Sequence, residues 1–177
     1  AACDADNDCV LQELGPTLEV IDALKEHYHV LGMARRSQLT SGAPYHPNIA
    51  WYQVDIAERA PLASTFEKIR RGGPVDAVFH LAAHYDFTGQ DHPEYERTNV
   101  IGLRNVLEEC RLLRPRRFVF SSSVAACEFP ADGVVIDEDT PPDGAHVYAR
   151  SKATGEAMLA EYAEFFPSTI VRFAAMF

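Results

Sequence analysis

The residues best suited to chemistry are Tyr148 and Lys152, together with the three serines at 121–123. Positions four apart on a helix share one face, so the phenol and the ammonium would point the same way. A phenol is a poor base near neutral pH because its ordinary pKa is about 10, and a neighbouring ammonium favours the phenolate. With Ser123 holding a substrate oxygen, this set could move a proton to or from an alcohol or a carbonyl. The alternative is a surface helix that carries a tyrosine and a lysine by chance.

Strands and helices alternate along the sequence around these residues. Strands are expected at 29–34, 49–54, 75–81, 117–120 and 168–173, and helices from 15, over 61–71, over 93–113 and over 148–165. The expected strands are continuously apolar, which predicts βαβ crossovers and a parallel sheet covered on both faces. Ligands of such sheets bind outside the carboxyl ends of the strands. The candidate polar residues fall at those ends: Arg35, Asp55, His84, Ser123 and, after a loop, Tyr148.

Composition indicates a globular, acidic chain. It has 177 residues, of which 47% are hydrophobic, and a net charge of −10, which argues against a nucleic-acid partner. No apolar run approaches the ~20 residues of a membrane span, so no membrane partner is expected. The four cysteines form no C-x-x-C pair, so neither a metal site nor a disulfide framework is expected, and a reducing, cytoplasmic location is favoured. His80 and His84 are interpreted as non-ligands.

Four motifs in residues 15–177 resemble those of the extended short-chain dehydrogenase/reductases. That family includes NAD(P)-dependent epimerases and dehydratases and 3β-hydroxysteroid dehydrogenase-like enzymes. The motifs are HLAA at 80–83, TNV at 98–100, FSSS at 120–123 and YARSK at 148–152. The resemblance implies an α/β, Rossmann-type, doubly wound parallel sheet with helices on both faces. It also implies a homodimer that forms through the helices at 93–113 and 148–165.

The resemblance assigns roles to the matching residues. Tyr148 would be the catalytic acid/base, Lys152 would lower its pKa and hold the nicotinamide ribose, and Ser123 would orient the substrate. Asn99 would join this catalytic group near the nicotinamide, or else be an ordinary polar residue of a helix; Asp55 would contact adenine, or else be a turn residue. The implied cofactor-binding residues are Gly15, Arg35, Arg36, Asp55, Ile56, Leu81, Ala82, Ala83, Asn99, Ser121, Tyr148, Lys152 and Phe173.

The end of the family's second strand distinguishes NADP from NAD. An acidic side chain there binds the ribose 2′-hydroxyl and repels a 2′-phosphate. This sequence has Ala34 at that position, followed by Arg35 and Arg36. Guanidinium groups suit a phosphate, so NADP is the expected cofactor and NAD the alternative. The alternative is that Arg35 and Arg36 are solvated surface residues that bind no phosphate.

The sequence departs from the family pattern at both ends. The family opens with an apolar strand and a G-x-x-G-x-x-G turn that places a pyrophosphate on a helix N-terminus. Gly15 matches the last glycine, but Cys9 and Gln12 replace the other two. We therefore expect an irregular segment at 1–14 and an irregular or missing first strand. Three explanations are open. Residues 1–14 form an irregular substitute for the strand and glycine turn, or this N-terminus is not the native one, or cofactor binding has been lost. The NAD(P)-binding domain at 15–177 lacks most of the family's C-terminal substrate lobe.

The combined interpretation is an NAD(P)-dependent oxidoreductase or epimerase. Hydride would pass between a carbinol or carbonyl carbon of a small-molecule substrate and the nicotinamide while Tyr148 moves the proton. By resemblance, Val124 in place of a glutamate makes dehydration less favoured, and Cys127 in place of a tyrosine argues against a nucleotide sugar. The alternatives are a non-catalytic dinucleotide-binding or interaction module, and a truncated fragment of such an enzyme.

Overall fold

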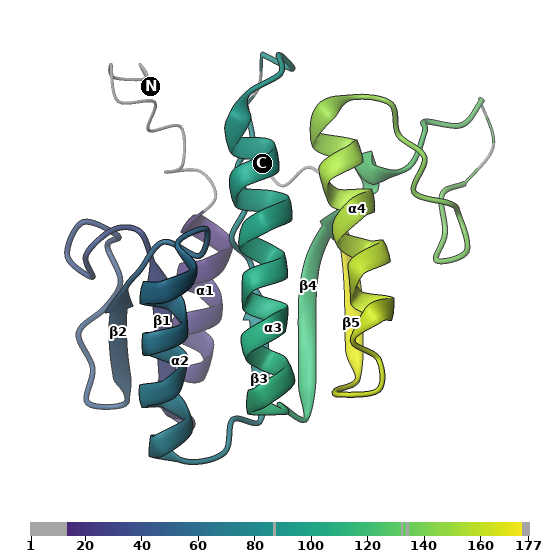
Figure 1. The fold of residues 1–177 in the computed structure, drawn as a ribbon. Coiled ribbons are helices and arrows are strands. Elements are labelled where there is room, and N and C mark those ends of the chain that lie inside the picture. Colours follow the sequence, from purple (N-terminus) through teal and green to yellow (C-terminus); the bar gives the residue numbers. More distant parts are fainter. Residues whose placement is uncertain (1–13, 87, 132, 134, 175–177) are drawn as a thin grey trace.

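The computed structural model describes residues 14–86, 88–131, 133 and 135–174 (Figure 1). The elements, in order, are α1 (Leu14–Leu24), β1 (Val30–Ala34), β2 (Ile49–Gln53), α2 (Arg59–Gly72), β3 (Ala77–His80), the π-helix η2 (Tyr95–Gly102), α3 (Leu103–Leu113), β4 (Arg117–Ser123), the 3-10 helix η3 (Val124–Ala126), α4 (Val147–Glu161) and β5 (Ser168–Phe173). Of the segment predicted to be irregular, 1–13 lies outside the described residues, and Leu14 already begins α1. None of the described helices is long and apolar enough to cross a membrane.

The strands pair in parallel, as predicted, but they form two separate sheets. One sheet contains β1 and β2, and the other has the order β3–β4–β5. Figure 1 shows α2, α3 and α4 on one face of these strands and α1 behind them. Helices therefore cover both faces, which confirms the predicted doubly wound class, and the break between β1 and β3 falls where the first strand was expected to be irregular or missing.

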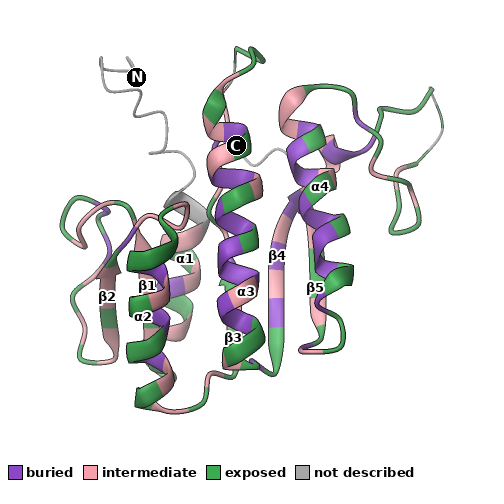
Figure 2. Ribbon diagram, viewed as in Figure 1, coloured by how far each residue is buried: buried purple, intermediate pink, exposed green. Residues whose placement is uncertain are grey.

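The main core lies between β4 and the helices in front of it. Phe118 and Phe120 of β4 are 0% and 2% exposed and belong to one cluster with residues of α2, α3 and α4. The buried positions in Figure 2 follow the inner faces of α3 and α4 and alternate positions of β4. Gly155 allows α4 to approach closely, because a Cβ there would lie 2.6 Å from Cζ of Phe120. This packing fixes α4 against the strand that ends at Ser123.

The helix expected at 93–113 is not a uniform α-helix. It begins at residue 93, widens into the π-helix Tyr95–Gly102 and continues as α3. A Cβ at Gly102 would lie 2.7 Å from Cγ1 of Ile56, so this helix passes very close to the segment that follows β2. π-Helical turns occur frequently at functional sites. Here the widened segment contains Asn99, a predicted site residue.

Candidate functional site

The predicted catalytic residues Tyr148 and Ser123 lie at the start of α4 and at the carboxyl end of β4. Tyr148 lies in the first turn of α4, which His146 caps by accepting a hydrogen bond from the Ala149 N–H at 3.4 Å. Ser123 is the last residue of β4, and its Oγ accepts a bond from the Ala125 N–H at 3.1 Å. A helix start and a strand end thus hold the phenol and the serine hydroxyl on rigid elements.

Lys152 occupies the predicted position on the same helix face as Tyr148. Its Nζ lies 5.6 Å from the centroid of the Tyr148 ring and 5.2 Å from that of Phe120. The ammonium is buried and donates a hydrogen bond to the main-chain oxygen of Ser121 at 2.8 Å. A buried cation beside a phenol favours its ionised form, because the local charge is poorly screened by water.

Three further aromatic rings surround Tyr148. Tyr85 meets it edge-on at 4.7 Å between centroids, His146 is stacked at 6.1 Å, and Tyr95 is tilted at 6.4 Å. These residues come from the loop after β3, from the cap of α4 and from η2. Sequence reasoning missed Tyr85 and Tyr95 as neighbours of the site, although their place beside the HLAA and TNV motifs was a usable signal.

Asn99 connects three segments of the site. Its Oδ1 accepts a hydrogen bond from the His84 N–H at 2.6 Å, and its Nδ2 donates to the His84 carbonyl at 3.0 Å and to Ser151 Oγ at 2.9 Å. Ser151 Oγ in turn donates to the main-chain oxygen of Tyr148 at 2.8 Å. Asn99 is only 4% exposed, and these contacts are all with protein. Its predicted place beside the cofactor stays a prediction.

Two histidines near the end of β3 are buried. The His80 ring stacks with the rings of Phe118 and Phe120, at 6.1 and 5.9 Å between centroids. Burial, reinforced by Lys152, lowers the pKa of His80 to about 3, so the ring is neutral. Burial and the neighbouring His92 lower the pKa of His84, whose Nε2 is buried without a hydrogen-bond partner among the described residues. Over the described part of the chain, His, Cys, Asp and Glu side chains form no cluster of three that could hold a metal.

The polar residues after β1 and β2 form ion pairs with η2 and the residue before it. Arg35 contacts Glu94 at 3.3 Å, and Asp55 contacts Arg97 at 2.8 Å. Asp55 also accepts a bond from the Ala57 N–H at 2.9 Å, so it is a turn residue, as the alternative interpretation held. The hydrogen bonds that the Arg97 guanidinium donates to Asp55 and Glu58 raise the pKa of Arg97. Adenine contact by Asp55 remains a prediction.

Most predicted cofactor residues line one groove of about 1500 Å³ between β1 and β3. Seven of them do so: Arg35, Arg36, Asp55, Ile56, Leu81, Ala82 and Ala83. The predicted catalytic residues Ser123, Tyr148 and Lys152 lie outside its lining. Phe173 pairs in register with Ser123 at the end of β5, away from the groove, and its side chain is exposed. Gly15 lies in the first turn of α1, and its surroundings fall outside the described residues.

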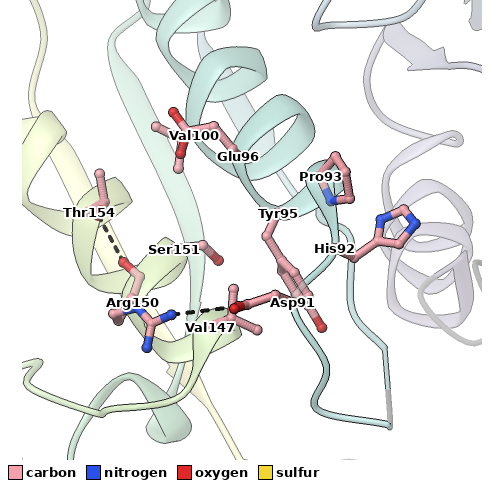
Figure 3. Close-up of a pocket in the computed structure, with 10 residues that line it drawn as sticks. All are labelled: Asp91, His92, Pro93, Tyr95, Glu96, Val100, Val147, Arg150, Ser151 and Thr154. Atoms are coloured by element: carbon pink, nitrogen blue, oxygen red, sulfur yellow. Dashed lines mark hydrogen bonds and ion pairs between the residues drawn. The ribbon is translucent and has the colours of Figure 1, made fainter.

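A second, smaller pocket of about 580 Å³ lies between η2 and α4 (Figure 3). Its wall includes Tyr95 and Ser151, and Arg150 reaches Asp91 at 3.7 Å at its rim. This pocket is lined by residues of the two helices that the family resemblance predicts as the dimer contact. His92 lines both this pocket and the groove between β1 and β3.

Comparison with known proteins identifies the family of the chain. Residues 19–177 match the model of the NAD dependent epimerase/dehydratase family. A UDP-glucose 4-epimerase of Streptococcus mutans is 32% identical over 120 residues, which are 66% of this chain and 34% of that protein. A putative dihydroflavonol 4-reductase of Synechocystis is 36% identical over 88 residues, or 47% of this chain and 26% of that protein. The chain thus spans about a third or less of these relatives.

The solved structures give the same picture of the fold. The UDP-glucose 4-epimerase of Brucella ovis, solved in complex with NAD, superposes with a TM-score of 0.68 at 27% identity. The match covers 90% of this chain and 48% of that one. The predicted Rossmann-type arrangement is confirmed by this similarity.

Proposed function

Because the chain belongs to the NAD-dependent epimerase/dehydratase family, we propose that it provides the cofactor-binding and catalytic half of an NAD(P)-dependent oxidoreductase or epimerase. The observation that carries this proposal is the set of Tyr148, Lys152 and Ser123 at the carboxyl end of β4. Its substrate would be a small molecule with a hydroxyl or carbonyl group, and the protein would act in the cytoplasm.

The chain's own residues would carry the proton transfer. When bound, the cofactor supplies the acceptor or donor of the hydride. The Tyr148 phenol would take or give the proton of the substrate hydroxyl, while Ser123 Oγ holds the same oxygen. Lys152, fixed by the Ser121 carbonyl, would keep a positive charge beside the phenol. The aromatic rings of Tyr85 and Tyr95 would keep water away from it.

The residues of the groove fit a dinucleotide along its carboxyl edge. Arg35 and Arg36 follow β1, and Ala82 and Ala83 follow β3. The Nε2 of His84, which has no hydrogen-bond partner among the described residues, is buried at the same edge. We propose NADP as the preferred cofactor, with NAD as the alternative. Neither Arg35 nor Arg36 carries the negative charge that would repel a 2′-phosphate.

The surface of η2, α3 and α4 would form a homodimer contact. Ile101 and Leu112 are exposed apolar residues of η2 and α3, and the pocket in Figure 3 lies on the same two-helix surface. Neither nucleic acid nor a membrane is proposed as a partner. The assembly can be checked by sedimentation of the purified chain.

Titration with NADPH and with NADH, followed by nucleotide fluorescence and by heat, tests the proposal. We expect tighter binding of NADPH, and loss of that preference in the double variant Arg35→Gln, Arg36→Gln. Arg104→Gln, on the surface of α3, is the matched control and should bind as the parent does. Tyr148→Phe should still bind cofactor but lose hydride transfer by about 10²–10⁴-fold, the usual contribution of a general acid or base.

No binding of either nucleotide by a folded chain would overturn the proposal. That result would favour the second candidate function, a non-catalytic interaction module. The observation behind this candidate is the groove between β1 and β3. It separates the described strands into two sheets at the place where the cofactor is expected to bind.

A further inference from the structure

A buried ion pair lies beside the predicted catalytic residues, and the proposed proton transfer does not use it. Arg172 of β5 donates two hydrogen bonds to Glu156 of α4, from Nε to Oε1 at 3.1 Å and from Nη2 to Oε2 at 2.8 Å. The Glu156 side chain is 6% exposed and the Arg172 side chain 16%. The Ser122 hydroxyl also donates to Oε1 of Glu156. Both carboxylate oxygens are therefore occupied, in a place where water screens charge poorly.

Glu156 lies one helical turn after Lys152, and both side chains are buried. A lysine and a glutamate four residues apart on a helix are neighbours that attract one another. Here Lys152 donates to the main-chain oxygen of Ser121 at 2.8 Å, while Glu156 accepts from the hydroxyl of Ser122, the next residue of β4. The two opposite charges of α4 are thus held at successive residues of the same strand.

The remaining nitrogen of the Arg172 guanidinium fixes the loop that leads into α4. Nη1 donates to the main-chain oxygens of Thr140, at 2.7 Å, and of Asp137, at 3.4 Å. Hydrogen bonding to Glu156 raises the pKa of Arg172, so the guanidinium stays charged. A planar guanidinium fork can bind a carboxylate at both oxygens and these carbonyls together, which a compact ammonium cannot. Arg172 therefore connects β5, α4 and the loop before α4.

The titratable groups near Lys152 come from its own helix and from two strands. Tyr148 and Glu156 lie on α4, Arg172 lies on β5, and His80 lies on β3. Burial, and then Lys152, lower the pKa of His80 to about 3, so this neighbour is neutral. Among these groups Glu156 brings the negative charge, so a change in its counter-charge acts on Lys152.

We propose that Arg172 is a positioning residue for Lys152. By binding both oxygens of Glu156, it keeps this carboxylate from drawing the ammonium away from the Ser121 carbonyl and the Tyr148 ring. Without the guanidinium, the buried carboxylate would lose its counter-charge, and the ammonium one turn away would replace it. Lys152 would then neutralise Glu156 instead of favouring the phenolate. The inference rests on the proposed function, because it concerns the proton transfer assigned to Tyr148.

Titration of the Tyr148 phenol tests this inference without cofactor or substrate. The full chain is labelled with carbon-13 at tyrosine Cζ and followed by NMR as the pH rises, and the spectrum of Tyr148→Phe assigns the signal. Arg172→Gln should raise the pKa of the phenol by about 1, which lowers its ionised fraction about 10-fold below that pKa. Arg70→Gln removes the partner of Glu109 from another partly buried pair and, as the matched control, should leave the titration unchanged.

Two double variants identify the cause of the rise. Arg172→Gln combined with Glu156→Gln removes both charges, so the phenol should titrate as in the parent. That variant still lacks the bonds from Arg172 to the loop, so its return to the parent value would exclude the loop as the cause. In a Lys152→Met background, Arg172→Gln should have little further effect, because no ammonium is left to move. A carboxylate that acts directly on the phenol would keep its full effect there.

Loss of one partner of a buried ion pair is strongly destabilising, so circular dichroism first identifies the variants that fold. If Arg172→Gln does not fold, Arg172→Lys takes its place, and it should raise the pKa of the phenol by a smaller amount, because an ammonium cannot bind both oxygens in the same way.

Three results would overturn the inference. They are an unchanged phenol titration in a folded Arg172 variant, no return to the parent value when Glu156→Gln is added, and an undiminished effect in the Lys152→Met background. None of these measurements needs a nucleotide. Failure of this inference is therefore distinct from failure of the proposed function, which would appear as absent nucleotide binding.

Discussion

The two sheets of this protein differ in how completely they are packed. In β4, at the centre of the β3–β4–β5 sheet, Phe118 and Phe120 are almost fully buried. No side chain of β1 or β2 is buried to that degree. The first sheet carries residues expected to bind the cofactor, and the second ends beside the predicted catalytic residues. The sheet at the predicted catalytic residues is thus well packed, whereas among the described residues the facing edges of β1 and β3 have no strand partner.

The two sheets are held together mainly at their carboxyl edge and through α2. Arg35 and Asp55 form ion pairs with Glu94 and Arg97 there, and Val54 and Phe66 join the main core cluster. Exposed and half-exposed ion pairs contribute little stability, while a buried core contributes most of it. We therefore expect the β3–β4–β5 sheet to dominate the free energy of unfolding and the β1–β2 pair to open first.

The largest effect should come from shortening a core side chain of β4. Phe118→Ala should lower the free energy of unfolding by about 3–5 kcal/mol, because it removes a fully buried ring and leaves a cavity. Phe79→Ala on the neighbouring strand should cost about 1 kcal/mol or less, since that ring is already half exposed. Urea denaturation measures both. Equal losses would mean that the groove side is as well packed as the core.

An intermediate effect should appear as a pH dependence of stability from His80. Above pH 6.5 the ring is neutral in both the folded and the unfolded state, so its contribution is fully present. As the pH falls, only the unfolded chain binds the proton, because burial and then Lys152 hold the folded pKa at about 3. Stability is lost progressively from pH 6.5 towards 3, by about 2 kcal/mol at pH 5.

Denaturation at pH 7 and pH 5 measures this loss. His80→Gln should remove the His80 part of the difference between the two pH values, and His27→Gln, at an exposed position, is the control. If the parent protein is equally stable at both pH values, His80 is hydrated in the folded state. The β3–β4–β5 sheet would then not be better packed than the β1–β2 sheet at this position.

The smallest effect should come from the ion pairs that link the two sheets. Arg97→Gln removes contacts to Asp55, Glu58 and Glu94 and should cost about 1 kcal/mol, because the groups are partly exposed. Hydrogen exchange should become faster in 49–53 but not in 117–123. Arg104→Gln breaks a surface pair with Glu161 between α3 and α4 and should change neither segment. Faster exchange in both segments of the Arg97 variant would mean that the sheets open as one unit.

Sequence reasoning succeeded where short-range geometry decides the outcome. The spacing of Tyr148 and Lys152 places them on one helix face, and the apolar strands between helices define a parallel, helix-covered sheet. It was less successful for side chains whose partners lie far away in the chain. The Asn99 bonds to His84 span 15 residues, the Asp55–Arg97 pair spans 42 and the Arg35–Glu94 pair spans 59.

The sequence by itself therefore determined the fold class and the helix face that Tyr148 and Lys152 share, because helix and strand periodicities are properties of neighbouring residues. Only the tertiary structure decided that Asn99 is buried against the backbone of His84, that aromatic rings surround Tyr148, and that the helix at 95–102 widens beside Ile56. It also decided that the strands divide into two sheets around a groove. These features depend on how separate elements pack, which no local pattern encodes.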